Sequence, residues 1–159
     1  MPRVRAHQGG AGEYLMRYLC FDIGDKRTGI ASGSDELKIA SPVEVIECAL
    51  VSDGSALIDR LMKVIEEHEP DALVIGLPIN MDGTEGPRAK SMRTLADRLA
   101  ERSGLTVHLF DERLTSAEAD WSMANTGMTR GQKKAKRDAI AAAHILRGYM
   151  HHRDTEDTE

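Results

Sequence analysis

Short apolar runs dominate the first third of the chain after its polar leader. Residues 18–23 (YLCFDI) are mostly apolar and end at Gly24, as expected of a buried strand. The segment 28–32 follows a short polar turn, and apolar residues alternate in the segment 42–48, which is typical of a strand at a sheet edge. These three segments predict an antiparallel meander.

After Gly54 the apolar positions change from strand spacing to helix spacing, and they predict an amphipathic helix that ends near His68, before Pro70. The same signals predict strands over 72–75 and 106–110. They also predict helices over 87–103 and over about 134–150, and a helix that begins at Thr115 and carries Trp121.

The alternation of strands and helices in the second half favours an α/β fold. We expect a mixed central sheet, with antiparallel N-terminal strands followed by parallel strands, and helices on both faces. No internal repeat or linker interrupts the pattern, so residues 16–150 are predicted to form one domain. We expect residues 1–15 to be a disordered extension and residues 151–159 an acidic disordered tail.

Composition narrows the class of protein. With 159 residues, 41% hydrophobic and 30% charged, the chain has the balance of a globular domain. It contains no run of about 20 apolar residues of the kind that spans a membrane and no secretory signal, so a cytoplasmic location is predicted. Cys20 and Cys48 give neither a disulfide framework nor a zinc motif.

Acidic residues follow two of the predicted strands and begin the last helix. Asp22 ends the first strand, Asp111 and Glu112 follow the strand 106–110, and Asp138 lies on the apolar face of the last helix. A carboxylate is costly to bury unless it is hydrogen-bonded or coordinates an ion, and ligands of open α/β sheets gather at strand ends. The sequence thus predicts that Asp22, Asp138 and one acid of the pair Asp111 and Glu112 meet.

Each acid also has a purely structural interpretation. Asp111 or Glu112 could cap the turn that follows its strand, and spacing does not choose between them. Asp22 could bond the turn amides near Gly24, and Asp138 could be a solvated helix residue.

Three convergent carboxylates favour a hard divalent cation. Mg²⁺ or Mn²⁺ takes oxygen ligands, and two such ions can activate a water and stabilise the leaving oxygen in phosphodiester hydrolysis. The net charge of −5 argues against a broadly basic nucleic-acid surface. However, five cations stand between Arg130 and Arg137, beside Asp138, where they could contact phosphate.

Four motifs in this order resemble those of the YqgF family, also called RuvX. They are DIGDKRTGIA at 22–31, GLPINMDGTEG at 76–86, DERLT at 111–115 and KAKRDAIAA at 134–142. The similarity extends over about residues 16–150. Proteins of this family have been proposed to resolve Holliday junctions and to process pre-16S ribosomal RNA.

The resemblance implies a ribonuclease-H-like fold and a metal-dependent endonuclease that acts on structured nucleic acid. It implies catalytic and metal-binding roles for Asp22, Glu112 and Asp138. Nucleic-acid contacts are expected from Lys26, Arg27, Arg113, Arg130, Lys133, Lys134, Lys136 and Arg137.

The expected substrate is the 5′ end of pre-16S ribosomal RNA, with a Holliday junction in DNA as the alternative, and the expected state is a monomer or homodimer. Two other classes compete with a nuclease. One is a non-catalytic nucleic-acid-binding module, in which three acids would repel phosphate. The other is an actin-like or sugar-kinase-like nucleotide binder, for which the chain is too short.

Overall fold

The computed structural model describes residues 15–51, 53–115, 129 and 136–157. The strands are β1 (Arg17–Ile23), β2 (Arg27–Ser34), β3 (Ala40–Glu47), β4 (Ala72–Leu77) and β5 (Thr106–Asp111). The helices are α1 (Ser55–His68), α2 (Pro87–Ser103) and α5 (Arg137–Asp157), with a short 3₁₀ helix, η1 (Glu112–Leu114).

The five strands form one mixed sheet in the order β3-β2-β1-β4-β5. β1 and β2 are antiparallel, as are β2 and β3. β4 lies parallel to both β1 and β5. The predicted fold class, an α/β fold with antiparallel strands followed by parallel ones, is confirmed. β1 is central, so it is covered on both faces.

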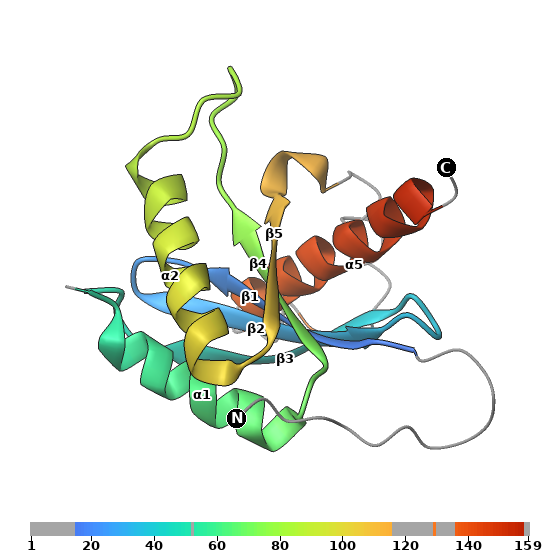
Figure 1. Cartoon of the computed structure of the whole chain (residues 1–159), viewed down its shortest axis with the longest axis horizontal. Helices are drawn as coiled ribbons and strands as arrows, with labels where there is room; N and C mark the ends of the chain where they lie inside the picture. The colour runs from blue at the N-terminus through green and yellow to red at the C-terminus, as the bar shows by residue number, and fades with distance from the viewer. Residues whose placement is uncertain (1–14, 52, 116–128, 130–135, 158–159) are drawn as a thin grey trace.

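The alternation of side chains along β1 assigns each residue to one layer. Leu19 and Phe21 pack in the hydrophobic core formed with α1 and α2. Tyr18 and Cys20 pack in the core formed with α5 on the other face (Figure 1). Because successive strand residues point to opposite faces, Asp22 lies on the α5 face.

The boundaries of the helices follow the positions of proline and glycine in the sequence. Pro87 is the first residue of α2, where its missing N–H costs nothing. Gly104 ends this helix in the left-handed conformation, with φ of 74°. α1 ends at His68, as predicted, and the next residue, Glu69, is also left-handed.

The last helix is longer than the sequence predicted. We expected it to end near Met150 with a disordered tail beyond, whereas α5 continues to Asp157. No proline or glycine follows Met150 to break the helix. Arg153 also holds the extension against the sheet, because its Nη1 lies 3.2 Å from Oδ2 of Asp35 and its guanidinium lies over the Tyr18 ring.

Some predicted features lie outside the described residues. They include the helix expected from Thr115 with Trp121, and nearly all of the N-terminal extension. Among the described helices, none is long and apolar enough to cross a membrane.

Candidate active site

Asp22 stands at the end of the sheet where β1, β4 and β5 finish, which we call the acid end. In the register of the sheet, Asp22 is paired with Gly29 of β2. Phe21 is level with Ile75 of β4, so Asp22 lies beside Gly76. Asp22 is partly buried, which a carboxylate tolerates only with compensation.

Glu112 reaches Asp22 across Gly76. A Cβ atom built on Gly76 would lie 2.7 Å from Glu112 Oε1 and 2.8 Å from Ile145 Cδ1. The missing side chain therefore makes the space in which the Glu112 carboxylate lies. Gly76 belongs to β4, where its missing side chain serves packing.

Asp138 approaches the same place from the first turn of α5. A Cβ atom on Gly29 would lie 1.8 Å from the backbone oxygen of Asp138, so this glycine lets the start of the helix touch β2. The Asp138 side chain pairs with Arg27, whose Nε lies 3.3 Å from Oδ2. The backbone of Asp138 thus lies against Gly29, the residue of β2 that is paired with Asp22 in the sheet.

Burial and the neighbouring acids raise the pKa of Asp22 from 3.8 to about 7. Burial is the largest cause, followed by the negative charge of Glu112 and a hydrogen bond that protonated Asp22 donates to Glu112. The charge of Asp138 raises the pKa further, and Arg88 lowers it. Burial and the two neighbouring carboxylates therefore oppose the ionisation of Asp22 more strongly than Arg88 favours it.

The three acids are not equally close to one another. Within the described part of the chain, the group of three potential metal ligands with all ligand atoms within 4.8 Å is Glu44, Glu67 and His68, from β3 and the end of α1. Because Glu112 raises the pKa of Asp22 more than Asp138 does, Asp138 is the acid that lies farther out. The geometry is a close pair with an outer third carboxylate.

The structure separates the roles of Asp111 and Glu112. Asp111 caps η1 by accepting a hydrogen bond from the Arg113 amide at 2.9 Å, and it also binds the Arg113 guanidinium. Glu112 points to Asp22 instead. Arg113, predicted to contact nucleic acid, is thus already paired within the chain.

Among the other predicted nucleic-acid contacts, Lys26, Lys136 and Arg137 are exposed, and Arg27 is shared with Asp138. Arg130, Lys133 and Lys134 lie outside the described residues.

No pattern in the sequence pointed to a role for Arg88. Its Nη1 donates to Asp25 Oδ1 at 2.6 Å and its Nη2 to the Ile23 carbonyl at 2.8 Å. Arg88 therefore ties the start of α2 to the end of β1, next to Asp22. It also lines an open cavity of about 570 Å³ together with Lys90.

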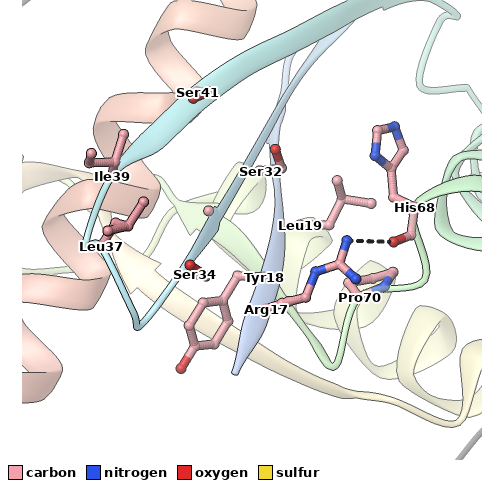
Figure 2. Close-up of a pocket in the computed structure, with 11 residues that line it drawn as sticks. Arg17, Tyr18, Leu19, Ser32, Ser34, Leu37, Ile39, Ser41, His68 and Pro70 are labelled. Atoms are coloured by element: carbon pink, nitrogen blue, oxygen red, sulfur yellow. Dashed lines mark hydrogen bonds between the residues drawn. The ribbon is translucent and has the colours of Figure 1, made fainter. Parts of the chain in front are cut away.

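A second pocket, of about 250 Å³, lies at the opposite end of β1. Figure 2 shows Arg17 donating to the His68 carbonyl beside this pocket. Serine, apolar and basic side chains line it, and no carboxylate does. It is therefore separate from the acid end.

A mixed sheet in the order β3-β2-β1-β4-β5, with antiparallel strands followed by parallel ones and helices on both faces, is a ribonuclease-H-like fold. Two solved structures share it. RuvC of Thermus thermophilus with a Holliday junction substrate aligns with a TM-score of 0.59 and 14% identity, covering 88% of this chain and 96% of that one. The fowlpox virus resolvase with Holliday junction DNA aligns with a TM-score of 0.56 and 12% identity, covering 87% and 99%.

The chain belongs to the RuvX family, described as Holliday junction resolvase, whose profile matches residues 16–152. A relative from Agathobacter rectalis is 40% identical over 85% of this chain and 94% of its own length. One from Myxococcus xanthus is 38% identical over 91% and 93%. Both are named "Putative pre-16S rRNA nuclease". The predicted family and enzyme class, a nuclease, are confirmed.

Proposed function

We propose that this protein is a divalent-metal-dependent endonuclease that trims the 5′ end of pre-16S ribosomal RNA. The observation that carries the proposal is the close pair of carboxylates, Asp22 and Glu112, at the acid end. Two carboxylates that lie together in a partly buried site repel each other unless a proton or a cation lies between them. The names of the relatives support the RNA substrate.

The residues at the acid end fit Mg²⁺ or Mn²⁺. Carboxylate oxygens are the ligands that these ions prefer, and Gly76 leaves the space in which Glu112 meets Asp22. Asp22, Glu112 and Asp138 would hold the metal. Ions bound there would stabilise the negative charge that develops on the phosphate during hydrolysis.

The chain's own side chains supply the positioning. Arg27 holds Asp138 through its ion pair, and Arg88 holds the end of β1 through the Ile23 carbonyl. The exposed cations Lys26, Lys136 and Arg137 lie on the turn after β1 and at the start of α5. From these positions they can contact the phosphates of a strand that crosses the acid end.

A Holliday junction is the second candidate substrate, and the description of the family favours it. Symmetric junction cutting requires two copies of the site in a dimer, so the oligomeric state separates the candidates. The cytoplasmic location stays a prediction from the sequence.

Cleavage assays test the proposal. Purified protein is incubated with end-labelled precursor RNA or with a labelled four-way DNA junction, with Mn²⁺ or with chelator. We expect cutting of the RNA that requires the metal and is abolished in Asp22→Asn. The matched control is Asp97→Asn on the exposed face of α2, which should cut normally.

Two results would contradict the proposal: full activity in Asp22→Asn, or cutting that persists in chelator. Cutting of the junction with an intact precursor RNA would replace the RNA substrate by the second candidate.

A further inference from the structure

The loop between β4 and α2 carries the most exposed large hydrophobic side chain among the described residues. Met81 is 92% exposed, whereas the other exposed residues of this kind range from 40% to 68%. An apolar side chain gains nothing from water. A single exposed residue of this kind is ordinary, so the argument depends on how the loop holds it.

The loop is closed by its own hydrogen bonds. The Asn80 amide donates to the Thr84 carbonyl at 2.9 Å, and the Gly83 amide donates to the Asn80 carbonyl at 2.8 Å. The Thr84 hydroxyl donates to Asp82 Oδ1 at 2.6 Å. Gly83 has φ of 88°, which glycine adopts without strain. These contacts fix the turn and leave Met81 pointing outward.

The loop is also attached to the acid end. It begins directly after Leu77, which is level with Asp111 in the sheet. Arg113 donates to the Asn80 carbonyl at 3.4 Å while it binds Asp111, the neighbour of Glu112. Figure 1 shows the loop rising beyond the end of the sheet, beside η1. A substrate seated on the acids would therefore meet the loop.

The charges of the loop select which part of a nucleic acid it can touch. Asp82 and Glu85 flank the tip, and hydrogen bonds from Thr84 hold the pKa of Asp82 below its usual value. Glu85 is likewise ionised beside Arg93, which lowers its pKa. These negative charges repel phosphate, so the contact open to Met81 is with the bases. Apolar side chains, methionine included, are used by proteins as wedges between base steps.

We infer that Met81 inserts among unstacked bases of the substrate and so selects distorted or unpaired nucleic acid for the acid end. The inference deepens the proposed function and depends on it. Paired, stacked bases leave no space for the side chain without the cost of unstacking. Single unpaired bases beside a helix leave such space. Met81 is therefore a specificity-determining residue.

The test measures binding apart from cleavage. Every variant is made in an Asp22→Asn background, and the probe is a precursor RNA fragment that carries a fluorescent adenine analogue at an unpaired position near the cut. We expect an unstacking signal with Met81 and its loss in Met81→Ala, with about tenfold weaker binding. Met81→Leu should keep both. The matched control is Leu37→Ala, an exposed apolar residue of the β2–β3 turn, which should change neither.

The inference is overturned if Met81→Ala binds as tightly as its parent and gives the same signal. An equal loss of affinity for fully paired RNA and for the precursor fragment with its unpaired position also overturns it, because Met81 would then not select between the two RNAs. Weak binding of both RNAs by the parent itself, together with no cleavage by the unmodified protein, would point to failure of the proposed function instead.

Discussion

Asp22→Asn is expected to stabilise the metal-free protein although it abolishes cleavage. The pKa of Asp22 lies about 3 above its ordinary value, and each pKa unit corresponds to about 1.4 kcal/mol. Ionised Asp22 therefore costs the folded state up to about 4 kcal/mol near neutral pH. Because Asp22 is only partly buried and water screens part of this cost, we expect a gain of about 2 to 4 kcal/mol.

The sign of the pH dependence follows from the raised pKa. Between pH 3.8 and about 7, folded Asp22 holds a proton that the unfolded chain has lost, so the free energy of unfolding falls as pH rises through this window. The advantage of the asparagine variant should accordingly be greatest at about pH 8. At about pH 5 it should shrink to less than half, because folded Asp22 is then protonated.

Urea unfolding in the presence of chelator, at these two pH values, measures the effect. Asp97→Asn serves as the control, because the Asp97 side chain is exposed on α2 and should give no such gain. A variant less stable than the parent at high pH, or a gain equal at both pH values, would refute the reasoning. Added Mn²⁺ should reverse the order, since it stabilises only the protein that binds it.

Two glycine substitutions test how the acids are brought together. Gly76→Ala should cost about 1 kcal/mol, because the nearest atoms are the mobile ends of Glu112 and Ile145. It should nevertheless reduce cleavage more than tenfold, as about 1.4 kcal/mol of lost transition-state stabilisation would do, and urea unfolding beside kinetics separates the two effects. Gly29→Ala would instead place a Cβ against the backbone of Asp138. It should destabilise the protein by about 3 kcal/mol or more, and a melting temperature like that of the parent would contradict the close contact between Gly29 and the start of α5.

Several features of the site followed from the sequence because they depend on periodicity. Strand alternation and the polar residues at strand ends identified Asp22, and the apolar stripe of the last helix directed Asp138 toward the sheet. Proline and glycine positions predicted the boundaries of α1 and α2 closely. In each case the deciding interaction is local, so the spacing along the chain carries it.

Contacts between distant segments could not be predicted from the sequence in this way. The choice between Asp111 and Glu112 depended on which of them approaches Asp22 of β1, and the role of Arg88 in α2 depended on the Ile23 carbonyl of β1. The last helix extends past Met150 with Arg153 anchored to Asp35. Each of these outcomes is set by a partner far away in the chain.

The sequence by itself determined the order of strands and helices and the acids that could do chemistry, because hydrophobic period and the cost of burying charge act on single segments. Only the tertiary structure decided how close those acids come. Gly29 and Gly76 set that distance by having no side chain. The tertiary structure also decided that the loop with Met81 lies at the same end of the sheet. When two distant segments of the backbone come close, neither segment carries a sequence pattern that predicts the contact.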